Sequence, residues 1–367
     1  MSSIYIGLMS GTSLDGADIC IVEFDENKIV SYQGKTFHFT KKLSEKLFEL
    51  REKQLSLKSL GKIDKALGNF FSECILDFIQ EFSLQNKNIS AIGSSGLTIY
   101  HHPTGSNPFT IQIGDPNVIS KKTKIDVISD FRRADIALNG EGAPLTPAFH
   151  KWYFGNEDKT RIILNLGGIA NITIIDPKKN IVGLDTGPAN TLIDNWSRKI
   201  WNIPFDKDGQ LAKQGKISSS LLNLLTSDKY FLRKPPKSTG TEYFNLDWLY
   251  HYLNQLDFDI ENKDILRTLT QLTVLTIKNS IESVIPEPCE IIICGGGVSN
   301  LFLIEQLKNQ LPRHEIHSSQ RYNLDPNLVE SIAFAWLAKQ RINKIPSNEP
   351  LVTGADRKTI LGSIHSK

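Results

Sequence analysis

The chain of 367 residues contains no long apolar run and few cysteines. No stretch approaches the roughly 20 apolar residues that a transmembrane helix needs, so we expect no membrane span. The first residues, MSSIYIGLMSGTS, lack a basic segment before a short apolar run, which argues against a signal peptide. The cysteines Cys20, Cys74, Cys289 and Cys294 have neither C-x-x-C nor zinc-site spacing. These absences predict a cytoplasmic protein, with Cys20 and Cys294 as buried thiols in strand-like runs.

The chain also lacks an excess of positive or of negative residues, since its net charge is only +2. A dedicated nucleic-acid binder would show a basic stripe or block, so nucleic acid is not an expected partner. Hydrophobic residues make up 40% and charged residues 22% of the chain, which is typical of a soluble globular protein. The length suits two domains. We expect them to cover residues 1–155 and 156–367, with the boundary near Trp152 to Asp158.

The most informative stretch spans residues 161–190. The apolar run from Ile162 to Leu166 stops at the pair Gly167-Gly168, and a second run, Ile172 to Ile175, follows closely. A glycine pair between two runs rich in β-branched residues predicts a tight hairpin. We expect its glycines to adopt positive φ and to leave backbone N–H groups uncovered, an arrangement that suits a phosphate.

A third run, Ile181 to Leu184, ends at Asp185 and is followed by Thr186-Gly187-Pro188. Catalytic groups often lie at strand ends, so the Asp185 carboxylate is a candidate general base. The alternative is an ordinary meander in which Asp185 caps the helix predicted over Asn190 to Trp201. The local sequence leaves both interpretations open.

A hairpin of the same design is predicted near the start of the chain, between the strand-like runs Ile4 to Leu8 and Ile19 to Phe24. The turn between them contains small and polar residues that could bind a phosphate: Gly11, Thr12, Ser13, Leu14, Asp15, Gly16, Ala17 and Asp18. It has no G-K-[ST] and so is not a Walker loop. Asp15 or Asp18 could hold Mg²⁺ through water, and the alternative is a plain hairpin. Two such hairpins, about 160 residues apart, indicate a duplicated architecture.

Further strands are predicted over Ile89 to Gly93, Thr110 to Ile113 and Asp126 to Ser129. Helical spacing of apolar residues predicts two helices within Lys41 to Phe82 and one over Asp264 to Ile285. A metal role for His101-His102 is unfavoured without a third ligand, and we expect them to be surface or loop residues.

Two adjacent arginines, Arg132 and Arg133, follow the strand that ends at Ser129. Guanidinium groups in this position could bind a carboxylate or a phosphate. Aspartates flank the pair, so a surface salt-bridge cluster is the alternative. Neighbouring residues do not decide between these two roles.

The second half of the chain contains three more features of interest. The apolar strand Glu290 to Cys294 is followed by Gly295, Gly296 and Gly297, which would let a flat ligand or a phosphate approach the backbone. The loop Lys234 to Gly240 is predicted to be rigid and to expose Lys237. Glu330 is a polar residue at the start of an otherwise apolar helix. It either has a functional role or is a first-turn acid that the helix dipole favours.

The order of these loops resembles the actin, Hsp70 and sugar-kinase superfamily. That resemblance implies an α/β fold of two ribonuclease-H-like domains of the actin/hexokinase type, with ATP in the interdomain cleft. Blocks from Met9 to Ala355 resemble the anhydro-N-acetylmuramic acid kinase family more closely: MSGTSLDGAD, QIGDPN, DFRRADIALNGEGAPL, LNLGGIANIT, GLDTGPANTLID, PPKSTG, CGGGVSN, VESIAFAWLA and VTGA.

The resemblance implies use of ATP and Mg²⁺ to open the 1,6-anhydro ring of anhydro-N-acetylmuramic acid and phosphorylate O6. The product would be N-acetylmuramate 6-phosphate, in recycling of cell-wall sugars, and the enzyme would be a homodimer. Asp185 matches the family's catalytic aspartate, and Glu330 matches an acid near the attacking water. Gly11 to Asp18 match the ATP loop. The resemblance further implies a second phosphate hairpin at Gly167-Gly168 and a nucleotide-binding turn at Gly295 to Gly297. It also implies that Arg132 and Arg133 bind the sugar.

Three blocks depart from the family pattern. Where the family has Ser-His-Gly-Gln-Thr, this chain has Ser94 to Thr98. Ser95 replaces the histidine of the family pattern, and Leu97 replaces the glutamine. Lys-Ser-Thr-Gly-Arg-Glu becomes Lys237 to Glu242, with threonine in place of arginine, and Gly-Gly-Gln-Gly becomes Asn139 to Gly142. Two alternatives therefore stay open: a kinase of the same fold for a different amino sugar, and a regulator that binds ATP without transferring phosphate.

Overall fold

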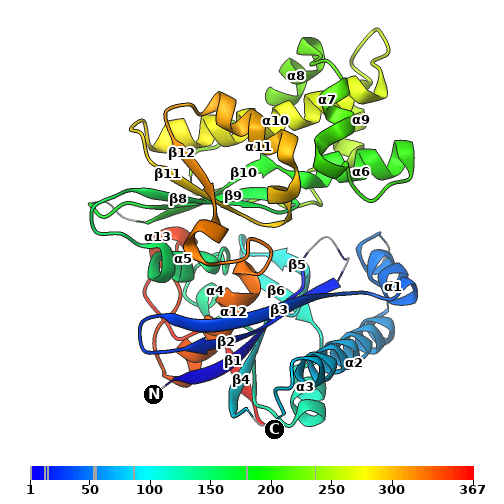
Figure 1. The fold of residues 1–367 in the computed structure, drawn as a ribbon. Coiled ribbons are helices and arrows are strands. Elements are labelled where there is room, and N and C mark those ends of the chain that lie inside the picture. The colour runs from blue at the N-terminus through cyan, green and yellow to red at the C-terminus, as the bar shows by residue number, and fades with distance from the viewer. Residues whose placement is uncertain are drawn as a thin grey trace. The chain divides into compact units, whose positions relative to one another are not determined.

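The computed structural model describes residues 2–11, 14, 16–52, 56–85, 87–178, 181–235 and 237–367 (Figure 1). Thr12, Ser13 and Asp15 of the predicted phosphate loop lie outside the described residues. The chain forms two compact units, residues 1–153 with 328–367 and residues 154–327. None of the helices in the described part of the chain is long and apolar enough to cross a membrane.

The first unit is built on a mixed sheet. Its described strands follow the order β13-β7-β4-β1-β2-β3. Their bounds are β1 Ser3–Met9, β2 Gly16–Phe24, β3 Ile29–His38, β4 Ile89–Ser94, β7 Val127–Ser129 and β13 Ser363–His365. β2 is antiparallel to β1 and β3, whereas β1, β4 and β7 are parallel to one another. The short β13 adds to β7 in the antiparallel direction.

The sheet of the second unit repeats this plan. Its described strands follow the order β10-β9-β8-β11-β12. Their bounds are β8 Arg161–Leu166, β9 Ile169–Ile175, β10 Val182–Pro188, β11 Glu290–Cys294 and β12 Glu315–Ser318. The strand directions match those of β3-β2-β1-β4-β7 one by one. The predicted duplication is therefore confirmed, and both units have a ribonuclease-H-like α/β fold.

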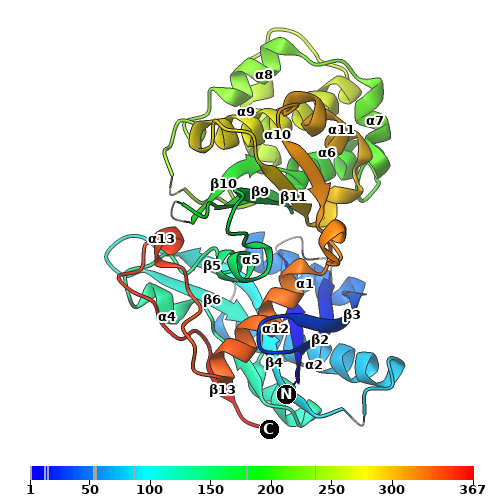
Figure 2. The same cartoon turned by 60° about the vertical axis from the view of Figure 1, so that its left-hand side comes forward.

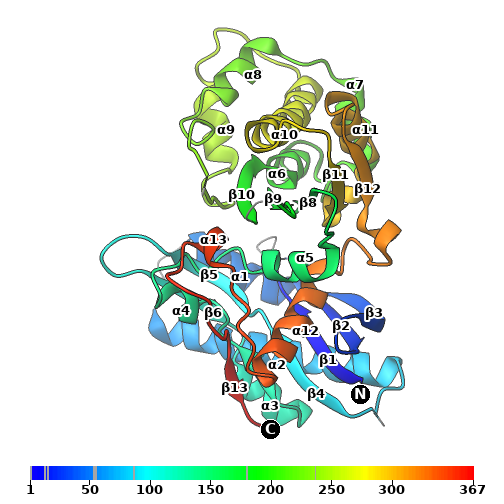
Figure 3. The ribbon, with the colours of Figure 1, turned by 90° about the vertical axis from the view of Figure 1, so that its left-hand side faces the viewer.

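Helices cover both faces of the first sheet, α2 on one face and α12 on the other (Figure 3). The helices of this unit are α1 Lys41–Glu52, α2 Leu57–Glu81, α3 Pro116–Thr123, α4 Arg133–Ile136, α5 Thr146–Phe154, α12 Val329–Ile342 and α13 Pro350–Thr353. The last residue of α5, Phe154, begins the second unit. Successive side chains of a strand point to opposite faces, so Ile6 and Leu8 of β1 pack in the core with α2. The two predicted helices within Lys41 to Phe82 are confirmed.

The C-terminal segment packs with the first unit and not with the second, to which the sequence analysis assigned it. α12 approaches β1 and β4 at two glycines. A Cβ atom at Gly7 would lie 1.8 Å from the carbonyl oxygen of Ser331, and one at Gly93 would lie 2.1 Å from that of Phe334. This backbone-to-sheet packing depends on residues more than 200 positions apart, so a boundary drawn along the sequence could not reveal it.

Helices α10 and α11 lie over one face of the second sheet (Figure 2). The four α-helices described between residues 190 and 253 pack against α10 in a separate apolar cluster. The bounds in this unit are α6 Asn190–Trp201, η1 Lys207–Gly209, α7 Gln210–Gln214, α8 Ser219–Thr226, α9 Leu246–Leu253, α10 Asn262–Val284, η2 Gly296–Ser299, α11 Leu301–Gln310 and η3 Ser319–Tyr322. Cys20 and Cys294 are buried as predicted.

Three strands of the first unit, β3, β5 and β13, were not expected from the sequence. β3 is an edge strand whose residues are mostly exposed or half-buried, and it therefore lacks an apolar run. β5 Leu97–His102 pairs with β6 Phe109–Ile113 in a small separate sheet. His101 and His102 therefore lie in a strand and not in a loop, and His102 is exposed, as expected of a surface residue.

Candidate active site

Asp185 lies within β10, where three hydrogen bonds fix its position. Its backbone N–H donates to the carbonyl oxygen of Lys237 at 3.0 Å. The N–H of Thr239 donates to Oδ2 of Asp185 at 2.9 Å, and the hydroxyl of Tyr230 donates to the Asp185 carbonyl oxygen at 2.8 Å. The loop 237–239 therefore sets the orientation of the Asp185 carboxylate.

The strand does not end at Asp185 as expected. β10 runs on to Pro188, and its pairing with β9 shifts register between Asp185 and Gly187. Such a bulge re-aims side chains next to it. Helix α6 has Ala189 at its N-cap, without a side-chain cap. The alternative in which Asp185 caps this helix is therefore wrong.

Lys237 was predicted to be exposed, but it is buried, with 7% of its surface accessible. Its Nζ lies 4.9 Å from the ring centroid of Tyr230. Burial lowers the pKa of Lys237, and the nearby positive charge of Arg233 lowers it further. The negative charge of Asp185 acts in the opposite direction. The pKa of Tyr230 is raised by burial and by the charge of Asp185. A buried cation thus lies close to the candidate base.

Asp228 anchors the segment that carries Tyr230. Its carboxylate accepts hydrogen bonds from the side chains of Tyr243, Trp248 and Tyr252 at 2.8–3.2 Å and from the Tyr230 N–H at 2.7 Å. Burial alone would raise the pKa of Asp228, but these hydrogen bonds together lower it. Because the folded-state pKa is depressed, this contribution to stability is present at neutral pH and is lost as the pH falls through that pKa.

Asp228→Ala is expected to lower the free energy of unfolding by about 2–4 kcal/mol, because it leaves three side-chain donors without their acceptor. Urea unfolding at neutral pH measures this loss. Asp228→Asn should recover part of it, since the amide oxygen still accepts. Asp257→Ala, at an exposed position of the same unit, is the matched control. Equal stabilities of the Asp228→Ala and Asp257→Ala variants would contradict the anchoring role.

The predicted hairpin at Gly167-Gly168 is confirmed, with β8 ending at Leu166 and β9 beginning at Ile169. Neither glycine has a positive φ, contrary to expectation. Their carbonyl oxygens accept hydrogen bonds from the first backbone N–H groups around the start of α6. A Cβ atom at Gly167 would have its nearest neighbour at 3.5 Å. A side chain at this position would therefore make only ordinary van der Waals contacts, so glycine is not needed here to avoid a clash.

The turn after β11 has the predicted strand, glycine turn and helix. Gly295 has φ of 85°, and a Cβ atom there would lie 2.4 Å from Oδ1 of Asn165, so only glycine fits. A Cβ atom at Gly296 would meet nothing within 4 Å. Asn300 caps α11 by accepting the N–H of Leu303 at 3.1 Å. The turn is thus packed on one side and open at Gly296.

In the first unit, Glu330 has charged neighbours from distant parts of the chain. Burial raises its pKa to about 7, and the charge of Asp18 adds to this rise while Arg132 opposes it. Asp18 in turn accepts a hydrogen bond from Thr36 Oγ1 at 2.6 Å. Burial lowers the pKa of His101 to about 4, with a further contribution from Arg132. Glu330 lies in the first turn of α12, as the helix-dipole alternative expects, but burial and the charge of Asp18 outweigh any lowering of its pKa by the dipole.

The two arginines have different environments. Arg132 donates from Nη1 to the carbonyl oxygen of Gly142 at 2.9 Å and lies in the electrostatic neighbourhood of Glu330. Arg133 is exposed, and its Nε pairs with Oδ1 of Asp130 at 2.8 Å. The surface salt-bridge alternative therefore describes Arg133, whereas Arg132 belongs to the Glu330 cluster.

The family model of anhydro-N-acetylmuramic acid kinase matches residues 3–367. The chain belongs to this family. It is 44% identical over 363 residues to the anhydro-N-acetylmuramic acid kinase of Aliivibrio fischeri, covering 98% of both chains. It is also similar to the proteins of that name from Vibrio cholerae, at 42% identity over 99% of this chain and 98% of the other, and from Coxiella burnetii, at 42% over 98% and 97%. The resemblance inferred from the sequence blocks is thus confirmed.

The departures from the family pattern at Ser95 and Leu97 have structural explanations. Leu97 is 0% exposed and packs in the core of the first unit, where it cannot contact a ligand. Ser95 Oγ accepts the backbone N–H of Ser10 at 3.1 Å and donates to the carbonyl oxygen of Gly96 at 2.7 Å. The 94–96 loop is thereby tied to the first hairpin without the polar side chains of the family pattern.

One positioning residue was missed by the sequence reasoning. Asp135 is completely buried and accepts hydrogen bonds from the Gly142 N–H, the Asn348 amide and the Thr353 hydroxyl at 2.8–2.9 Å. The Gly142 carbonyl oxygen in turn holds Arg132. The sequence did contain a signal for this role. Asp135 and Gly142 lie in the family block DFRRADIALNGEGAPL, and Thr353 lies in the family block VTGA.

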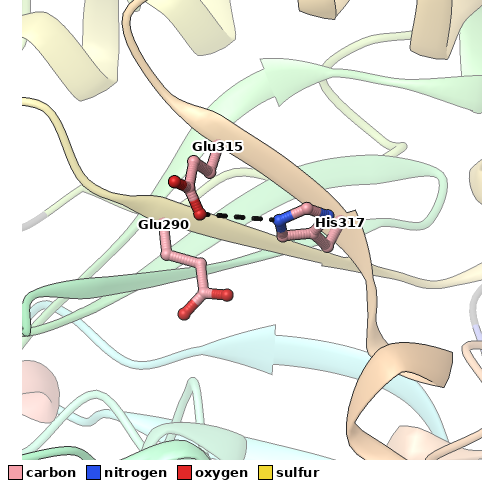
Figure 4. A group of neighbouring side chains, drawn as sticks. All are labelled: Glu290, Glu315 and His317. Carbon is pink, nitrogen blue, oxygen red and sulfur yellow. Dashed lines mark ion pairs between the residues drawn. The ribbon is translucent and has the colours of Figure 1, made fainter.

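Among the described residues, one group of three metal-ligand side chains lies together: Glu290, Glu315 and His317 (Figure 4). Glu290 already pairs with Arg161 at 2.9 Å and accepts the Tyr322 hydroxyl. Glu315 is 75% exposed, and its carboxylate lies 3.7 Å from the His317 ring. Because an arginine already neutralises Glu290, this group is an ion-pair cluster at the sheet edge and does not suit Mg²⁺.

Asp18 is the better candidate for Mg²⁺, since this ion prefers carboxylate oxygens and retains several waters. Its negative charge is one cause of the raised pKa of Glu330, so these two carboxylates are near enough to repel each other. A bound cation would relieve that repulsion.

Proposed function

We propose that this chain is an ATP-dependent kinase that hydrolytically opens the 1,6-anhydro ring of anhydro-N-acetylmuramic acid and phosphorylates O6. The product is N-acetylmuramate 6-phosphate, formed in recycling of cell-wall sugars in the cytoplasm. The observation that carries the proposal is the fixed Asp185 carboxylate, in a chain that matches the kinase family over nearly its full length. The family resemblance adds a homodimer to the proposal.

Asp185 acts as the general base in this reaction. It takes a proton from a water molecule as the water oxygen bonds to the anomeric carbon. The bond between that carbon and O6 breaks, and its electron pair passes to O6. O6 then attacks the γ-phosphorus of ATP, and ADP leaves. The sugar therefore gains one water and one phosphoryl group, and positioning supplies much of the rate.

Glu330 helps to orient the attacking water, and Arg132 stabilises the charge that develops on O6. Arg132 is the better candidate of the pair because Arg133 is engaged by Asp130. The proposed nucleotide contacts are the loop from Gly11 to Asp18, the pair Gly167-Gly168 and the turn Gly295 to Gly297. Asp18 would hold Mg²⁺ through water, and the bound ion supplies neutralisation of phosphate charge.

A coupled ADP-release assay with Mg-ATP tests the proposal. Anhydro-N-acetylmuramic acid should support ADP release, whereas N-acetylmuramic acid and N-acetylglucosamine should not. The product mass should rise by one phosphoryl group (HPO₃) plus one water. Preference for another sugar would favour the alternative of a same-fold kinase for a different amino sugar. ATP binding without transfer to any of the three would favour the regulator.

A further inference from the structure

A pocket of about 360 Å³ lies in the second unit beside Asp185. Its lining includes Lys229, Tyr230, Arg233, Ser238, Thr239 and Glu242. Two of these residues hold Asp185 directly, Tyr230 through its hydroxyl and Thr239 through its N–H. A group that enters this pocket is therefore a neighbour of the candidate base.

Two cations lie near Tyr230, a residue of the pocket lining. The Arg233 guanidinium lies 5.7 Å from the ring centroid of Tyr230, and Lys237 Nζ lies 4.9 Å from the same ring. The two cations repel each other, as the effect of Arg233 on the pKa of Lys237 shows. Within the described part of the chain, neither of them forms an ion pair with a carboxylate. Two cations near the same ring favour a bound anion.

The other polar groups of the pocket fit the same ligand. Lys229 adds a further exposed cation, and Ser238 and Thr239 contribute hydroxyl groups. Glu242 is the one acid among the described lining residues, and its carboxylate is folded against Gly240. Guanidinium and hydroxyl donors around an open cavity match the oxygens of a carboxylate or a phosphate.

We propose that Arg233, supported by Lys229 and the hydroxyls of Ser238 and Thr239, forms an oxyanion subsite next to Asp185. The oxyanion is the carboxylate on the lactyl ether of the sugar or the terminal phosphate of the nucleotide. This inference rests on the proposed function. It assigns to Arg233 a role in substrate selection that neither the family motifs nor the local sequence pattern indicated.

Arg233→Gln tests the subsite through Michaelis constants for three ligands. They are anhydro-N-acetylmuramic acid, 1,6-anhydro-N-acetylglucosamine, which has the same ring without the lactyl ether, and ATP. We expect one of the two anionic ligands to show a KM raised about 10-fold or more, as loss of a charged hydrogen bond does. The kcat should change less, because Arg233 is proposed to bind the ligand and not to transfer a proton. Arg233→Lys should restore part of the affinity.

Arg198→Gln, at an exposed position of the same unit, removes the same charge away from the pocket and should leave all three constants unchanged. A rise confined to the sugar with the lactyl ether identifies its carboxylate as the ligand, and a rise confined to ATP identifies the phosphate. Three unchanged constants in a folded Arg233→Gln protein overturn the proposal.

The experiment separates this proposal from the proposed function. If the unmodified enzyme phosphorylates the anhydro sugar but Arg233→Gln has no effect, only the subsite is wrong. If the unmodified enzyme transfers no phosphate, the proposed function fails. Calorimetric titration of the same three ligands into both proteins then still shows whether Arg233 binds an anion.

Discussion

Asp185→Asn is expected to lower kcat by a factor of about 10²–10⁴, the usual contribution of a general base. The amide has the same shape but cannot accept a proton from water. Its oxygen can still accept the N–H of Thr239, so the loop 237–239 should keep its place. ATP affinity should stay within a few-fold, because the substitution changes the base without removing a proposed nucleotide contact.

ADP release under saturating substrates measures the loss, and calorimetric titration measures ATP affinity in the same preparation. Asp259→Asn, at an exposed position of the same unit, controls for the loss of one negative charge. Unchanged turnover in Asp185→Asn would remove Asp185 as the base. A parallel loss of ATP binding would point instead to a structural role for this carboxylate.

Glu330→Gln is expected to lower kcat while making the protein more stable at alkaline pH. The carboxyl has a pKa of about 7 in the folded protein against an ordinary value of 4.5. A tenfold change in the acid dissociation constant corresponds to about 1.4 kcal/mol. Because the Glu330 side chain is partly accessible to solvent, we expect the substitution to raise the free energy of unfolding at pH 8 by only about 1–3 kcal/mol. The kcat should fall by about 10–100-fold through loss of the group that orients water.

The sign of the stability effect follows from linkage. A raised carboxyl pKa means that the folded state prefers the neutral form, so the wild type loses stability as pH rises from about 4.5 to about 7. Glutamine is neutral at every pH, and the gain from the substitution should therefore be small near pH 4.5 and complete above pH 7. Urea unfolding at both pH values measures it.

Activity should follow the same ionisation in the wild type, with kcat/KM rising through about pH 7 as the Glu330 carboxylate forms. In Glu330→Gln, kcat/KM should no longer rise with pH around pH 7. Glu45→Gln, at an exposed position of the first unit, should change neither stability nor the profile. A stability gain in Glu330→Gln that is equal at pH 4.5 and pH 8 would show that burial of charge is not its cause.

Much of the local structure could be predicted from residue patterns. The helix Asn190–Trp201 has the predicted bounds, and the glycine pair between two β-branched runs is a two-residue hairpin. The apolar strand before Gly295 and the helix after it are also as expected. These predictions succeed because periodicity and glycine conformation act over a few residues. β3 was missed because an exposed edge strand does not need an apolar run.

The sequence by itself determined the duplicated α/β fold, the kinase family and the order of the phosphate-type loops. Each depends on motifs whose residues are neighbours in the chain. Only the tertiary structure decided that Lys237 is buried, that Arg132 and not Arg133 lies with Glu330, and that α12 packs on the first sheet. Burial, desolvation and charge pairing depend on segments that are distant in sequence. The same physical reason explains why Glu330 has a pKa near 7, and why the cations around Tyr230 were not recognised as a group.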